Sequence, residues 1–299
     1  MKRSIVIFFV LVSNLAYSQD LIDRTMVEAQ KIIYKLEEDP DIRNYSEMIA
    51  HDSLNPESYF KRARGYYTIW LSGDKKDSVS FELFKKDLYR ANMLDSTNCC
   101  YNQWIANKCM LPDSLAIRYY NKSISVCGMT ERDFLERSFC LMRLKRYEDA
   151  IKDINMAKRL TQGTTDEVAR AFKTNDYIKY RGLCYAKLGK FKEAEKDLRK
   201  VIKEDGTNWQ NYIYLGIVKS MQGKYEEALK IYDDLRARAP FVISNYMYIG
   251  NVYHAMGNEL LAEKNWYFAE KNGVTVDEKN KAIDTQIDYL MHNFRLGAD

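Results

Sequence analysis

The side chains in this chain that could ligate a metal or act as nucleophiles are chiefly its six cysteines and three histidines. No two cysteines have the C-x-x-C spacing of zinc sites and thioredoxin-like redox sites. His51, His254 and His292 are far apart and belong to no metal-binding or nucleophile motif. The carboxylates are spread along the sequence, and no pair is singled out for acid–base catalysis. The sequence therefore predicts no enzymatic activity, no metal site and no cofactor.

A regular row of tyrosines points to binding instead. Tyr180, Tyr214 and Tyr248 follow one another at intervals of 34 residues (214 − 180 and 248 − 214). Aromatic side chains offer a large contact area at low entropic cost, so they are common in protein-binding surfaces. What they can do depends on the elements that carry them.

Those elements repeat with the same period. Residues 189–198 read GKFKEAEKDL, and residues 223–232 read GKYEEALKIY. Each unit has an anchor alanine followed four residues later by a larger apolar residue, which places both on one helical face. The anchors are Ala116, Ala150, Ala194, Ala228 and Ala262, spaced by 34 residues except for 44 between Ala150 and Ala194. The residues before each anchor also repeat, with a small residue such as Gly182 or Gly216 and a turn glycine such as Gly223. The unit is therefore helix, tight turn, helix.

At residues 212–240 the order of aromatic, apolar, glycine, alanine and closing proline resembles the tetratricopeptide repeat family. Lys219 departs from the pattern at a usual aromatic position. Arg137 and Arg181 depart at a usual apolar position, and we expect all three to loosen single contacts only. The resemblance implies an all-α fold, an α-solenoid of stacked antiparallel helix pairs.

The sequence divides into four expected parts. Residues 1–18 form a signal peptide, residues 19–130 form divergent helical repeats, and residues 131–273 form well-matched repeats. The ten extra residues near 161–172 are expected to lengthen the first helix of their repeat. Residues 274–299 are expected to form a capping helix, with Ile283, Ile287, Leu290, Met291 and Phe294 on one face, because the last repeat lacks a neighbour.

Export is expected from the first residues. Lys2 and Arg3 precede the apolar run Ile5–Val12, and small residues at 16–18 would permit cleavage before Gln19. The alternatives are a short membrane anchor or an ordinary first helix. No cysteine follows the cleavage point, so a lipid anchor is not indicated, and we expect a periplasmic or secreted protein with no membrane span in the mature chain. Losing Lys2 and Arg3 lowers the formal charge from +4 to +2, which gives no reason to expect nucleic-acid binding.

The candidate groove lies along the first helices of the repeats. Tyr180 is about 200° around its helix from Ile178, which faces the partner helix, so Tyr180 should face the concave side. Equivalent positions in three repeats give the candidate binding residues Tyr180, Leu183, Ile213, Tyr214, Ile217, Met247, Tyr248 and Asn251. The alternative is that the tyrosines pack between first helices and bind nothing.

The same hairpin geometry suggests a disulfide. The start of a first helix lies beside the end of its partner, so Cys127 could bond to Cys99 or Cys100. The other reading of the cysteines is that they are small buried apolar residues.

The family resemblance implies an exported scaffold or adaptor that binds another protein or a peptide segment in the groove, within a cell-envelope assembly. The alternative is a carrier that holds a polymer or an apolar ligand there.

Overall fold

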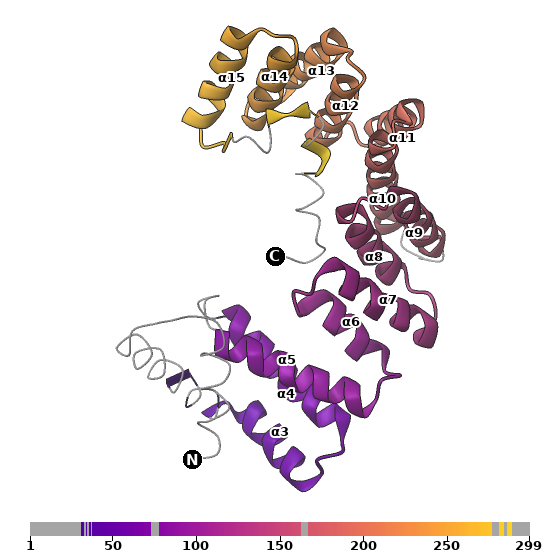
Figure 1. Cartoon of the computed structure of the whole chain (residues 1–299), viewed down its shortest axis with the longest axis vertical. Helices are drawn as coiled ribbons and strands as arrows, with labels where there is room; N and C mark the ends of the chain where they lie inside the picture. The colour runs from indigo at the N-terminus through magenta and orange to yellow at the C-terminus, as the bar shows by residue number, and fades with distance from the viewer. Residues whose placement is uncertain are drawn as a thin grey trace. The chain divides into compact units, whose positions relative to one another are not determined.

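The computed structural model describes residues 31–32, 34, 36, 38–72, 78–162, 167–276, 281–283 and 286–288. The expected signal peptide, residues 1–18, lies outside them. The described residues contain helices and no strand, which confirms the all-α fold (Figure 1). The helices are α3 (Pro40–His51), α4 (Pro56–Ser72), α5 (Ser78–Leu94), α6 (Cys99–Lys108), α7 (Asp113–Cys127), α8 (Glu131–Arg143), α9 (Tyr147–Thr161), α10 (Glu167–Lys187), α11 (Phe191–Glu204), α12 (Trp209–Met221), α13 (Tyr225–Arg238), α14 (Ser244–Ala255) and α15 (Glu259–Lys271).

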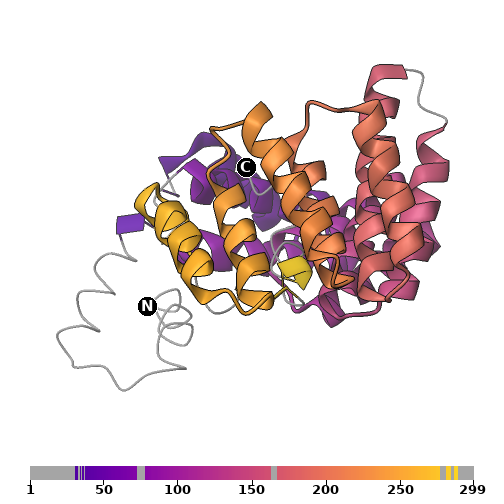
Figure 2. The ribbon, with the colours of Figure 1, turned by 90° about the horizontal axis from the view of Figure 1, so that it is seen from above.

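The chain divides into two compact units, residues 1–110 and 111–299. In the first unit α4 packs against α5. In the second, α8 packs against α9, α10 against α11, α12 against α13 and α14 against α15. The first helices of these pairs also adjoin one another, α10 beside α12 and α12 beside α14 (Figure 2). The repeats of the second unit are therefore stacked hairpins, as the sequence indicates.

The repeat anchors form the core of the second unit. Ala150, Ala194, Ala228 and Ala262 are fully buried, and Ala116 is nearly so. A Cβ added at Gly216 would come within 2.3 Å of the Tyr232 ring, and one at Gly250 within 2.5 Å of Trp266. The glycines therefore let a bulky side chain of the second helix lie directly on the first, and that confirms the expected close approach.

Tight turns join the helices of each pair. Gly189, Gly223 and Gly257 have φ of 70°, 72° and 75°, a left-handed conformation that glycine adopts at little cost. Lys145 has φ of 58° in the turn between α8 and α9. A side chain at this φ is strained, so this turn is less favourable than its three counterparts.

The residues that depart from the repeat pattern form ion pairs. The Arg181 guanidinium donates to both carboxylate oxygens of Asp197 at 2.7 and 2.8 Å, and to Asn155 on the preceding hairpin at 2.7 Å. Arg137 makes the same contacts with Asp153 and Asn121. The expectation that these departures only loosen contacts is therefore wrong. Each arginine, on the first helix of its hairpin, bonds both to the second helix of that hairpin and to the preceding hairpin.

Lys219 follows the same principle. Its ammonium lies 2.7 Å from Glu195 on α11 and 2.8 Å from Glu227 on α13.

The repeat that carries the ten extra residues has a longer first helix than the others. This helix, α10, begins at Glu167 and has 21 residues. The expected long first helix is therefore present, and residues 163–166, just before it, lie outside the described residues.

Candidate functional site

The expected groove residues lie where the helical period puts them, on α10, α12 and α14. Their side chains, however, are mostly inside the protein. Tyr180 is half-buried, and the other seven are buried, with Leu183, Ile217 and Asn251 at 0% exposure. Tyr180 meets Phe139 edge to face at 5.0 Å, and Tyr248 stacks on Tyr232 at 6.1 Å. In this conformation the tyrosines pack between helices, which is the alternative that the sequence left open.

Burial also makes the polar groups of these side chains inaccessible to a ligand. It raises the pKa of Tyr214 to about 12, and Asp176 adds to the shift. The Asn251 side-chain oxygen accepts a hydrogen bond from the Trp266 indole at 2.7 Å. The tyrosine row is therefore a core feature of this conformation, and its role in binding stays a prediction.

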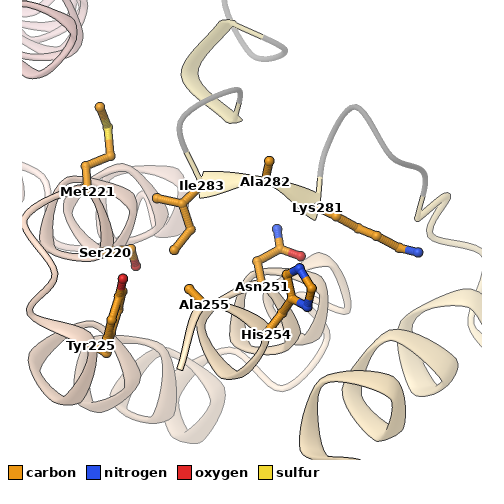
Figure 3. A pocket seen from close by; sticks show the side chains of 9 residues that line it. All are labelled: Ser220, Met221, Tyr225, Asn251, His254, Ala255, Lys281, Ala282 and Ile283. Atoms are coloured by element: carbon orange, nitrogen blue, oxygen red, sulfur yellow. The ribbon is translucent and has the colours of Figure 1, made fainter. Parts of the chain in front are cut away.

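A more accessible site lies at the carboxyl ends of the first helices. A cavity of about 350 Å³ opens there between the second unit's helices and the chain's own C-terminal segment (Figure 3). Asn251 is the member of the expected set that lines it. The full lining is Ser220, Met221, Tyr225, Asn251, His254, Ala255, Lys281, Ala282 and Ile283.

We call residues 281–288 the C-terminal segment, of which 281–283 and 286–288 are described. In Figure 3, Ile283 points toward the ends of α12 and α14, whereas Lys281 points away from the cavity centre. The Lys281 ammonium lies 4.7 Å from the centre of the Trp266 ring. Further along, Ile287 is 0% exposed. The segment is thus held by apolar burial as well as by a cation–π contact.

The segment ends at a carboxylate bound from two repeats. Tyr147, the first residue of α9, donates its hydroxyl to Asp288 Oδ1 at 3.1 Å. Lys187, the last residue of α10, donates its ammonium to Asp288 Oδ2 at 2.9 Å. Burial and the neighbouring Asp288 carboxylate both raise the pKa of Tyr147, so the phenol keeps its proton and remains a donor.

The capping helix expected over residues 274–299 stays a prediction, but the described part of the segment extends beyond the last repeat. Its described residues contact Trp266 on α15 but also α9, α10 and the ends of α12 and α14, whereas Leu260 and Tyr267 on α15 remain 78% and 61% exposed. The segment therefore reaches back across three earlier repeats. Leu290, Met291 and Phe294, which were expected on its apolar face, lie outside the described residues.

Sequence reasoning did not find Tyr147 and Lys187, although the repeat contains a signal for them. Lys187, Met221 and Ala255 follow one another at intervals of 34 residues, and each is close to the C-terminal segment. Tyr147 and Tyr225 are likewise equivalent, each beginning the second helix of its hairpin. Two repeat positions thus supply much of the site.

The cysteines and carboxylates show no second reactive centre in the described part of the chain. Burial raises the pKa of Cys109 and Cys140 to about 12, which keeps both as unreactive thiols. No three His, Cys, Asp or Glu side chains gather there as they would around a metal ion. Cys99 and Cys127 are disulfide-bonded, whereas Cys100, Cys109, Cys140 and Cys184 are free.

Comparisons with known proteins agree with the repeat architecture. A solved structure of the C-terminal part of a tetratricopeptide repeat-containing protein from Cytophaga hutchinsonii has a TM-score of 0.55, with 16% identity over 84% of this chain and 96% of that one. The structure of PilW, a type IV pilus biogenesis factor, has a TM-score of 0.54, with 14% identity over 77% of this chain and 96% of that one. At these identities the likeness concerns the fold alone.

The sequence comparisons are more local. A tetratricopeptide repeat-containing protein of Methanocaldococcus jannaschii is 29% identical over 118 residues, which are 39% of this chain and 19% of that protein. The chain thus spans about a fifth of that relative's length. The family model described as tetratricopeptide repeat matches residues 185–246, from the end of α10 to the start of α14. Tetratricopeptide repeat sequence, inferred from the spacing of alanines and glycines, is thereby confirmed for residues 185–246.

Proposed function

We propose that this chain is a non-enzymatic scaffold that binds a segment of another protein along the carboxyl ends of α10, α12 and α14. The observation that carries the proposal is that part of the same chain already lies there, the described residues 281–283 and 286–288 of the C-terminal segment. Its contacts show which chemistry the surface accommodates, namely apolar side chains such as Ile287 and a carboxylate such as Asp288. A stacked helical array offers such a surface over several repeats at once.

The surface is suited to a peptide rather than to a reaction. Its accessible groups are the Tyr225 ring, Met221, Ala255 and His254, and His254 is held by Glu259 at 2.8 Å. These side chains provide contact area and one polar edge, as peptide-binding surfaces do.

Affinity capture tests this function. The mature chain should retain a protein partner from an envelope extract, and Met221→Glu should lose it because a charge would then face the apolar lining. Met256→Glu is the matched control, since Met256 is exposed and outside the cavity lining. Capture by neither the wild type nor the control would contradict the scaffold function, and equal capture by all three would move the binding surface elsewhere.

We further propose that the protein is exported and acts in the periplasm or outside the cell. The bonded state of Cys99 and Cys127 supports this, because structural disulfides persist mainly in oxidising compartments. Among the described residues no helix is both long and apolar enough to cross a membrane. Mass spectrometry of the native protein should find an N-terminus at Gln19, and an intact Met1 on the native chain would contradict export.

The disulfide partners are part of the same proposal. Cys99 and Cys127 each form a disulfide, whereas Cys100 is a free thiol. Non-reducing peptide mapping should recover the peptides of Cys99 and Cys127 as one cross-linked species. Free Cys127 would remove this support for export.

A further inference from the structure

The most specific polar contact outside the helix pairs is the one made to Asp288. Tyr147 and Lys187 belong to different hairpins, and each donates to a different oxygen of the same carboxylate. The Tyr147 side chain is buried, and 13% of the Lys187 side chain is exposed. Two donors fixed by helix ends, one neutral and one charged, form a receptor for a carboxylate.

We propose that Tyr147 and Lys187 form the acid-recognising subsite for the partner, and that Asp288 occupies this subsite in the free chain as an internal competitor. The proposal rests on the scaffold function above and adds the partner's chemistry to it. A partner segment that binds here must first displace the C-terminal segment.

The C-terminal segment itself indicates what the partner must carry. Ile283 faces the cavity between α12 and α14, Ile287, four positions later in the sequence, is buried, and Asp288 follows directly. An apolar residue, a second one four positions later and an adjacent acid therefore fit the surface. Such spacing places the two apolar side chains on one face of a helical peptide. We commit to a protein partner with an acidic, amphipathic helical segment of this kind.

The internal contact is suited to competition because it is tethered and only partly enclosed. The Asp288 side chain is 31% exposed, so solvent screens its ion pair with Lys187. A short tether gives an effective local concentration on the order of millimolar. A partner must therefore form better contacts than the segment does, which excludes weak, nonspecific acidic peptides.

The test uses the full chain and a defined probe. The probe is a fluorescent peptide of residues 281–291, KAIDTQIDYLM, with blocked ends. Asp288→Asn in the protein weakens the internal competitor, so the probe should bind this variant about tenfold more tightly than wild type, the loss of one charged hydrogen bond. Asp234→Asn, an exposed acid on α13, is the matched control and should bind like wild type.

Two further arms identify the subsite. Adding Lys187→Met to Asp288→Asn should remove the gain, and a probe with asparagine in place of its Asp288 should bind the Asp288→Asn protein about tenfold more weakly. Hydrogen exchange of α10 and α12 reports whether the Lys187→Met protein keeps its fold. If the Lys187→Met protein unfolds, the comparison of the two probes, with and without the Asp288 carboxylate, tests the subsite by itself.

The outcomes separate the two proposals. Equal binding of the probe by wild type and Asp288→Asn, or binding that ignores the probe's carboxylate, would overturn the competition. Partner capture that does not differ between wild type and Asp288→Asn would also overturn it while leaving the scaffold function intact. Failure to capture a partner with either form would count against the scaffold function itself.

Discussion

The hairpins α8–α9 and α10–α11 are joined differently from α12–α13 and α14–α15. In the first two, Arg137 and Arg181 bridge their own second helix and the preceding hairpin. Thirty-four residues after Arg181 and Asp197 the chain has the apolar residues Leu215 and Ile231, and in α12–α13 the ion pairs to α11 and α13 come from Lys219 instead. One fold thus accepts either an ion-pair network or apolar packing at the same repeat position.

The difference also divides the binding surface. Tyr147 and Lys187, from the two hairpins that carry the bridging arginines, bind the carboxylate of Asp288, whereas Met221 and Ala255, from the two hairpins that lack this arginine, face the cavity. A segment that lies across both regions therefore contacts charged residues at one end and apolar residues at the other. This difference fixes the orientation in which a peptide can bind.

The largest effect should come from breaking one ion-paired junction. Arg181→Leu leaves Asp197 buried without its guanidinium, which should lower the free energy of unfolding by about 3 kcal/mol. Adding Asp197→Ile recreates the Leu215–Ile231 pair and should restore most of the loss. Urea unfolding followed by circular dichroism measures both. A double variant as unstable as the single one would show that the two kinds of junction are not interchangeable.

A smaller effect should separate two glycines at equivalent positions. Gly216→Ala places a methyl group against the Tyr232 ring and should cost about 2 kcal/mol by overpacking. At Gly182 the nearest atom to an added Cβ is Leu198 Cγ at 3.3 Å, and alanine favours the helix. Gly182→Ala should therefore change the free energy of unfolding by less than about 0.5 kcal/mol. Equal losses at both sites would contradict the close approach at Tyr232.

The smallest effect should be a gain. Lys145→Gly relieves the left-handed turn between α8 and α9 and should stabilise the chain by about 0.5–1 kcal/mol, since glycine's greater freedom when unfolded offsets part of the relief. Lys190→Gly, where φ is −82°, should give no gain. Thermal unfolding of the two variants side by side provides the measurement, and a destabilised Lys145→Gly would refute strain at this turn.

Local repetition made the hairpins predictable, whereas contacts distant in sequence were not. Ala194 and Gly216 could be placed because the rules of helix periodicity relate residues only a few positions apart. The groove tyrosines were assigned from the direction of Cα–Cβ alone. A tyrosine ring extends far enough to lie against a neighbouring helix about 8–10 Å away, and the buried Tyr248 stacks in this way on Tyr232 of α13.

The site at Asp288 shows the second limit. Tyr147 and Lys187 lie 141 and 101 residues before the carboxylate they bind. Nothing in the local sequence distinguishes Tyr147 from the aromatic residues that begin other second helices. Lys187 does stand out, because it is charged whereas the equivalent residues of the next two repeats, Met221 and Ala255, are apolar. This variation at a constant repeat position was the available signal.

Hydrogen exchange of the C-terminal segment tests the central claim most directly. In the full chain, the amides of residues 286–288 should exchange at least tenfold more slowly than in the isolated peptide, and Lys187→Met should remove most of that protection. Exchange at the rate of the free peptide in the wild-type chain would mean that the segment does not occupy this surface.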